Sequence, residues 1–152
     1  MIQEVFTMWG IIVALISGAL MSIQGVLNAG VTKQTSLWVS SSFVQFTALI
    51  ICLVAWFVTG RESSFGALLR IDHKYMLLGG ALGAFITITV IQSMNGLGPA
   101  KAALLIVVSQ LIIAYVIELL GLCGVERHPF EWRKLLGMVI MITGIVIFKW
   151  ER

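Results

Sequence analysis

The chain has 152 residues, of which 59% are hydrophobic and only 11% are charged. A soluble domain carries roughly 25% charged residues, so this composition excludes a water-soluble core and predicts a membrane protein. The formal net charge is +3, from 10 basic and 7 acidic residues, and no basic run or stacking pattern supports nucleic-acid binding.

Five segments are long and apolar enough to cross a bilayer, since a spanning helix needs about 20 mainly apolar residues. The first lies at the N-terminus, and it lacks the basic segment of a signal peptide, so we interpret it as a membrane helix. We therefore predict an all-α membrane protein with a single transmembrane domain over residues 1–152. The predicted helices cover about residues 5–30, 37–59, 75–95, 99–121 and 132–150.

The tryptophans give independent support for these segments. Indole favours the head-group layer of a bilayer, because it combines an apolar body with one hydrogen-bond donor. All five tryptophans of the sequence lie near predicted helix ends, at Trp9, Trp38, Trp56, Trp132 and Trp150.

Four amide side chains, three of glutamine and one of asparagine, interrupt the apolar segments. Gln24 and Asn28 share one face of the first helix, Gln45 lies in the second, and Gln110 lies near the middle of the fourth. Polar groups inside membrane helices either bond to neighbouring helices or face a water-filled pathway. We predict that these four residues line a substrate site, and leave helix–helix hydrogen bonding as an equally weighted alternative for the face of the first helix and for Gln45.

The fourth segment also carries Glu118, nearer to its end than to its middle. Charged groups within membrane helices are costly and often mark an ion or substrate pathway. We predict that Glu118 exchanges a proton or holds a cation during transport. The alternative is a carboxylate at the membrane surface that reaches water or pairs with a cation such as Arg127.

The longest hydrophilic link, between the second and third segments, contains the sequence SSFGALLRI. We expect a short interfacial helix there, with the apolar side chains of Phe65, Leu68, Leu69 and Ile71 touching lipid.

No pattern of catalytic or metal-binding residues is present. The two cysteines, Cys52 and Cys123, are isolated in apolar segments, and both histidines, His73 and His128, lie in links. No nucleophile, base and orienting residue converge by their spacing. We therefore expect no enzyme activity, no metal site and no cofactor.

The basic residues predict an orientation only weakly. With five spans, six of the ten basic residues fall on the side of the N-terminus and four on the other side, which favours a cytoplasmic N-terminus. The six are Arg61, Arg70, Lys74, Arg127, Arg133 and Lys134, and the four are Lys33, Lys101, Lys149 and Arg152.

So small a bias is typical of a chain that inserts in both orientations. Two such chains would form an antiparallel pair, in which ten helices are arranged as two inverted repeats. Inverted repeats recur in secondary transporters, with the substrate site at their interface. A bundle of five helices has little room for its own central pathway, which also favours a dimer.

Four stretches resemble the short, five-helix YdcZ-like inner-membrane proteins of the drug/metabolite transporter superfamily. They are GALMSIQGVLN, LLGGALGAF, GLGPAKAALLIVVSQLIIAYVIELLGL and RKLLGMVIMITGIVIF. They are spread over nearly the whole length of the chain, and their order and spacing carry the resemblance more than any single motif.

The resemblance implies a bacterial inner-membrane exporter built from two five-helix units in inverted orientation. The units are two copies of one chain, or a chain and an oppositely oriented paralogue. Gln24, Asn28 and Gln110 match the family's polar pattern, and Glu118 stands where relatives often have aspartate. Ser109 departs from the glycine expected before Gln110, which leaves the packing there open. The family implies no particular substrate.

The sequence therefore predicts a secondary transporter that exports a small solute by alternating access in a dimer. The alternative is a non-transporting membrane subunit that pairs with a paralogue or another membrane protein. An ion channel would need a continuous polar pore, and the polar side chains are too sparse to favour one.

Overall fold

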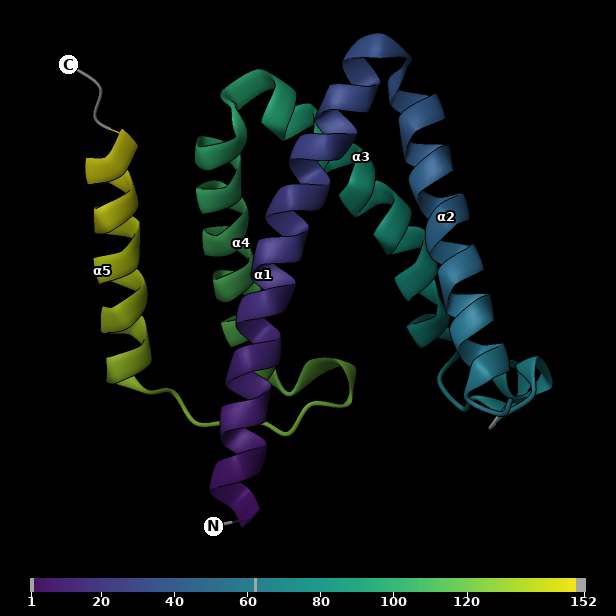
Figure 1. Cartoon of the computed structure of the whole chain (residues 1–152). Coiled ribbons are helices and arrows are strands. Elements are labelled where there is room, and N and C mark those ends of the chain that lie inside the picture. Colours follow the sequence, from purple (N-terminus) through teal and green to yellow (C-terminus); the bar gives the residue numbers. More distant parts are fainter. Residues whose placement is uncertain (1, 62, 150–152) are drawn as a thin grey trace. The chain divides into compact units, whose positions relative to one another are not determined.

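The computed structural model describes residues 2–61 and 63–149, and its regular structure is helical throughout this part of the chain. Short 3₁₀ helices occupy two of the links (Figure 1). The α-helices are α1 (Ile2–Gln34), α2 (Leu37–Val58), α3 (Gly79–Leu97), α4 (Pro99–Leu120) and α5 (Trp132–Lys149). The 3₁₀ helices are η1 (Phe65–Arg70), η2 (Lys74–Leu78) and η3 (Leu122–Gly124).

The prediction of an all-α membrane protein is confirmed at this level. Within the described residues, 4 segments are long and apolar enough to cross a membrane, namely Phe6–Gln34, Leu37–Val58, Lys74–Leu97 and Pro99–Leu120. The fifth predicted span forms α5, whose described residues include three basic ones, Arg133, Lys134 and Lys149. A membrane crossing by α5 stays a prediction, and its predicted end at Trp150 lies outside the described residues.

Local signals set the ends of α2 and α4 within one residue of their predicted positions. The hydroxyl group of Ser36 accepts a hydrogen bond from the backbone N–H of Val39 at 3.2 Å, which caps the first turn of α2. Pro99 begins α4 directly after Gly98, and α4 ends at Leu120, directly before Gly121, whose φ of 64° is left-handed. Proline at a helix start and glycine after its end are the preferred residues at these positions.

The first helix is longer than predicted at both ends. We expected it to end at Gly30, but it continues to Gln34. The hydroxyl groups of Thr32 and Thr35 donate hydrogen bonds to the carbonyl oxygens four residues earlier, both at 2.8 Å. These bonds satisfy the two hydroxyl groups on carbonyl oxygens of the same helix, so the polar sequence TKQ does not end the helix.

The chain divides into two compact units, residues 1–96 and 97–152. In the first, α1 and α2 form a hairpin with a short connection (Figure 1). Ser40 is 1% exposed, and its hydroxyl group donates to the carbonyl oxygen of Asn28 at 3.2 Å, which ties α2 to α1. Ser41 is also buried, and its hydroxyl oxygen has no hydrogen-bond partner among the described residues.

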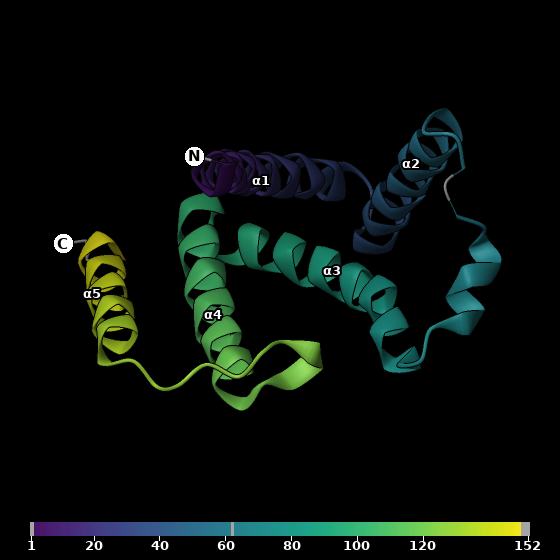
Figure 2. The ribbon, with the colours of Figure 1, turned by 90° about the horizontal axis from the view of Figure 1, so that it is seen from below.

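The third helix packs against α1 in the same unit (Figure 2). The contact depends on Gly25, because a Cβ atom there would collide with the thioether end of Met94 and would lie 3.3 Å from Cγ1 of Val90. Met94 is 5% exposed, so its side chain has little free space. A glycine at this position lets the two helices approach closely, as small residues do in membrane proteins.

The predicted interfacial helix in the link after α2 is present as η1, although it is a 3₁₀ helix. Phe65 packs on Trp56, with 4.9 Å between the ring centroids, and Nε1 of Trp56 donates to the carbonyl oxygen of Ser63 at 2.9 Å. The side chains of Phe65 and Leu69 are exposed. Their contact with lipid stays a prediction.

The second unit is a pair of packed helices, α4 and α5, joined by a connector that includes η3 (Figure 1). The connector folds back onto the end of α4. The backbone N–H of His128 donates to the carbonyl oxygen of Glu118 at 2.9 Å, and Nε of Arg127 donates to the carbonyl oxygen of Leu119 at 3.2 Å. These bonds satisfy carbonyl groups that the end of a helix leaves without partners.

Large apolar side chains cover the outside of every α-helix. Leu15, Val58 and Ile147 are examples, with 71%, 77% and 69% of their surface exposed. In water, exposed apolar surface of this extent would drive aggregation, whereas lipid tails solvate it. The exposure therefore agrees with helices that lie in a bilayer.

Candidate functional site

The first candidate site is a cavity of about 480 Å³ between α1 and α2. Gln24 and Asn28 reach it from α1, and Ser40 and Thr47 reach it from α2. Its remaining wall is apolar, formed by Leu27, Val31, Phe43, Val44, Ala48 and Ile51. Apolar walls with a few polar groups are the usual composition of small-molecule sites.

The predicted polar face of α1 is also present toward α3. Gln24 and Asn28 line a second, smaller cavity of about 50 Å³ together with Met21. The opposite wall comes from α3, through Ile86, Thr87 and Val90. Among the described residues, the side-chain amides of Gln24 and Asn28 form no hydrogen bond with the protein, so both can bond a ligand.

Gln45 lies on α2 and takes part in a helix–helix contact. Its Nε2 atom donates to Oγ1 of Thr87 on α3 at 3.1 Å. The hydroxyl group of Thr87 in turn donates to the carbonyl oxygen of Gly83 at 3.0 Å. Gln45 lines neither of the two cavities that contain Gln24, so the contact fits the structural alternative considered for this residue.

Gln110 belongs to the second unit and is exposed on α4, as is Ser109 before it. It is not among the residues that line a cavity between α4 and α5 in that unit. Of the four predicted substrate residues, the structure thus brings Gln24 and Asn28 together, links Gln45 to α3, and places Gln110 in the other unit.

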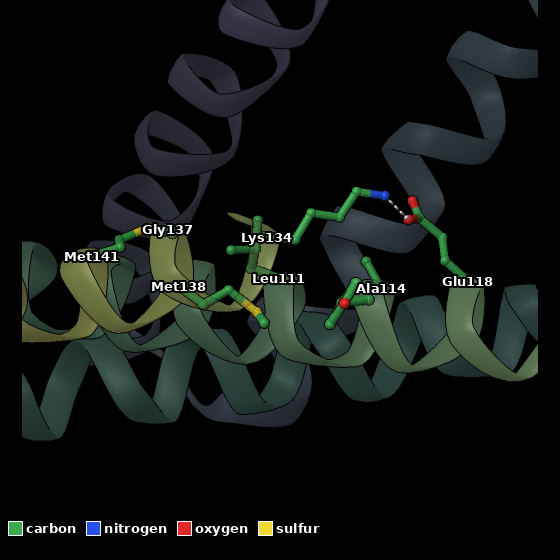
Figure 3. Close-up of a pocket in the computed structure, with 8 residues that line it drawn as sticks. Leu111, Ala114, Glu118, Lys134, Gly137, Met138 and Met141 are labelled. Atoms are coloured by element: carbon green, nitrogen blue, oxygen red, sulfur yellow. Dashed lines mark hydrogen bonds and ion pairs between the residues drawn. The ribbon is translucent and has the colours of Figure 1, made fainter. Parts of the chain in front are cut away.

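The second candidate site is a cavity of about 450 Å³ between α4 and α5, shown in Figure 3. Glu118 and Lys134 meet at its edge, with 3.1 Å between Oε2 and Nζ. Their side chains are 41% and 39% exposed, so the pair is accessible. Its other lining residues are Leu111, Ala114, Tyr115, Gly137, Met138 and Met141.

A second carboxylate and an aromatic ring lie close to the same ammonium group. Oε1 of Glu131 is 3.6 Å from Nζ of Lys134, and the ring centroid of Tyr115 is 5.8 Å from it. Lys134 stands in the charged first turn of α5, ahead of the apolar part of the helix.

Tyr115 connects this site to the α4–α5 connector. It is 9% exposed, and its hydroxyl oxygen accepts a hydrogen bond from the backbone N–H of Glu131 at 3.1 Å. Its ring lies 6.4 Å from the ring of Phe130, measured between centroids. The tyrosine therefore holds Glu131, and with it the start of α5, against α4.

Sequence reasoning identified Glu118 but missed its surroundings. The cation paired with it is Lys134, whereas the sequence suggested a residue such as Arg127, which bonds to Leu119 instead. One part of these surroundings could have been found from the sequence. Tyr115 lies three residues before Glu118, and residues three apart on a helix share one face. Nothing in the spacing placed Lys134 opposite that face, since a connector of irregular structure separates the two helices.

One family profile matches residues 9–147 of the chain, and its description reads "Putative inner membrane exporter, YdcZ". Neither the curated proteins nor the solved structures contain a significant match.

Proposed function

Because the chain belongs to the YdcZ family of inner membrane exporters, we propose that it is a secondary transporter that exports a small solute across the bacterial inner membrane. The transporting unit in this proposal is a dimer of oppositely oriented chains, in which one protomer rocks against the other. The partner is a second copy of the chain or a paralogue of the same fold. This arrangement supplies the inverted repeats on which many secondary transporters depend.

The observation that carries the proposal is the pair of unbonded amides in the first unit. Gln24 and Asn28 face cavities in a hairpin whose outer surface is apolar. An amide without a partner is costly in such surroundings unless water or a solute bonds to it. We assign substrate binding to these two residues, with Gln45 and Gln110 as further contacts in the assembled dimer.

Glu118 is the proposed coupling residue. It is a carboxylate at the edge of an accessible cavity, and it forms a partly exposed ion pair with Lys134. A carboxylate in this setting can exchange its partner for a proton or a substrate cation as the protomers rock. Its position thus supports a role in coupling, in which the ion pair with Lys134 is the arrangement without a bound proton or substrate cation.

Transport can be tested in proteoliposomes that contain the pH-sensitive dye pyranine, screened with small amines, acids and neutral solutes. For the solute that is moved, Asn28→Ala should lower the initial rate at least about tenfold, which corresponds to the loss of one good polar contact. Glu118→Gln should remove the dependence of the rate on pH while leaving helicity unchanged. Gln92→Ala is the matched control, because Gln92 is an exposed amide on α3 that lines neither cavity of its unit.

Equal rates for wild type and Asn28→Ala would contradict the substrate site, and an unchanged pH dependence in Glu118→Gln would remove Glu118 from the mechanism. If the folded chain moves none of the solutes, either alone or with an oppositely oriented paralogue, the non-transporting subunit becomes the better explanation.

The dimer requires both orientations in the membrane. In a variant without Cys52 and Cys123, single cysteines at Ser63 and at the C-terminus would be labelled in cells with a membrane-impermeant thiol reagent. Labelling of both sites to about half supports two copies of one chain inserted in opposite directions. Labelling of one site alone shows a fixed orientation and requires a paralogue as the partner.

A further inference from the structure

The surroundings of Lys134 have the composition of a cation-binding site. Two carboxylates, at 3.1 and 3.6 Å, and the ring of Tyr115, at 5.8 Å, surround one ammonium group. Carboxylates and aromatic faces within about 6 Å are the groups by which proteins bind ammonium compounds. The ammonium group present here is simply one that the chain itself supplies.

The cavity beside this ammonium group is larger than the lysine requires. It has about 450 Å³ of space, and its far wall is apolar, formed by Leu111, Ala114, Met138 and Met141. Methionine side chains adapt their shape and make favourable contacts with aromatic groups. The cavity can therefore accept an apolar group attached to a cation.

The charges at the site favour a cation over an anion. Glu118 and Glu131 together carry two negative charges, and Lys134 neutralises only one of them. The neighbouring Arg127 directs its Nε atom to the carbonyl oxygen of Leu119. If Lys134 moved away, a cation in the cavity would meet the carboxylate of Glu118 and the ring of Tyr115, with Glu131 close to the position that the ammonium group leaves, whereas an anion would be repelled.

Lys134 is able to move away. Its side chain is 39% exposed and its stem has four flexible carbons, and exposed ion pairs of this kind are weak. A ligand cation whose apolar group packs against the apolar wall of the cavity would add contacts that the lysine does not make.

We propose that the cavity between α4 and α5 binds an organic cation, meaning an ammonium compound with an apolar group, and that Lys134 is a tethered cation which the ligand displaces from Glu118. That the bound cation is exported rests on the proposed function, whereas the binding itself does not.

The test measures binding of benzyltrimethylammonium to the purified full-length chain in nanodiscs by isothermal titration calorimetry. Lys134→Met removes the tethered cation and keeps a side chain of similar length, and Lys134→Gln serves as a second variant. Glu118→Gln removes the carboxylate. Arg133→Met is the matched control, since Arg133 is the adjacent basic residue and does not line the cavity. Phenylmethanesulfonate is the anionic comparison ligand, and circular dichroism checks helicity.

We expect Lys134→Met and Lys134→Gln to bind benzyltrimethylammonium about tenfold more tightly than wild type, because the internal competitor is gone. Glu118→Gln should bind it at least about tenfold more weakly, also in combination with Lys134→Met. Arg133→Met should bind like wild type, and phenylmethanesulfonate should not bind.

The proposal is overturned if helical Lys134 variants bind the cation no more tightly than wild type, if Glu118→Gln leaves its affinity unchanged, or if the sulfonate binds more tightly than the ammonium compound. Binding that follows the expected order in a chain that transports nothing supports the cation site and contradicts the exporter. Transport of other solutes by a chain that binds no cation supports the exporter and contradicts the cation site.

Discussion

Nε2 of Gln45 on α2 donates a hydrogen bond to Oγ1 of Thr87 on α3, at 3.1 Å. Removing either partner should therefore weaken the packing of these helices. A double-mutant cycle with Gln45→Leu and Thr87→Val should give a coupling free energy of about 0.6 kcal/mol, the average for such bonds within membranes. The free energy of unfolding would be measured by titration with sodium dodecyl sulfate.

A control cycle for this bond pairs Gln45→Leu with Thr89→Val. The hydroxyl group of Thr89 bonds only to carbonyl groups of its own helix, at 2.9 and 3.1 Å, so the two substitutions should be additive. Additivity in the Gln45–Thr87 cycle as well would show that the bond contributes nothing to stability.

The close approach of α1 and α3 at Gly25 predicts a large difference between two glycines on one helix. Gly25→Leu should lower the free energy of unfolding by about 1–3 kcal/mol, because the new side chain meets Met94 and Val90. Gly18→Leu should not, since nothing lies within 4 Å of its Cβ position. Combining Gly25→Leu with Met94→Ala should recover part of the loss, and no recovery would argue against the contact.

The hydrogen bond between Tyr115 and Glu131 predicts that removing the tyrosine hydroxyl group lowers the stability of the protein. Tyr115→Phe leaves the backbone N–H of Glu131 without its partner at 3.1 Å, and should lower the free energy of unfolding by about 1 kcal/mol. Tyr75→Phe, at an exposed position, is the matched control. Equal stability of the two variants would mean that water replaces the tyrosine hydroxyl group without loss.

The left-handed backbone at the end of α4 predicts a requirement for glycine. Gly121 has φ of 64°, and a Cβ atom there would lie 3.1 Å from Cβ of Arg127. Gly121→Ala should thus lower the free energy of unfolding by about 1–2 kcal/mol. Gly144→Ala, at a helical position with nothing within 4 Å, should be neutral or stabilising. If both substitutions behave alike in the same titration, the connector does not constrain this turn.

The sequence predicted those features that depend on residues close to one another along the chain. α2 begins directly after Ser36, and α4 begins at Pro99 and ends directly before Gly121, because caps and breakers act within one turn of helix. The polar face of α1 also followed from helical spacing, and Gln24 and Asn28 line the same cavities.

The pairing of side chains from different helices could not be predicted in this way. Gln45 has its partner on α3 and Glu118 has its partner on α5, and both partners depend on how the helices are rotated against each other. The sequence gives the polar face of each helix, but not the rotation at which two faces meet. For this reason the sequence leaves both substrate binding and helix–helix bonding open for Gln45, whereas the structure shows that its amide bonds to Thr87.

The apolar spans differ in length, from 29 residues in α1 to 22 in α2 and in α4. At 1.5 Å per residue these are about 44 Å and about 33 Å, around a hydrocarbon layer of about 30 Å. As spanning helices, α2 and α4 fit this layer almost upright, whereas α1 would have to tilt or project. No single membrane thickness suits both lengths, so hydrophobic mismatch gives the lipids an influence over the tilt of these helices, and acyl-chain length becomes a variable that any reconstitution of this protein must control.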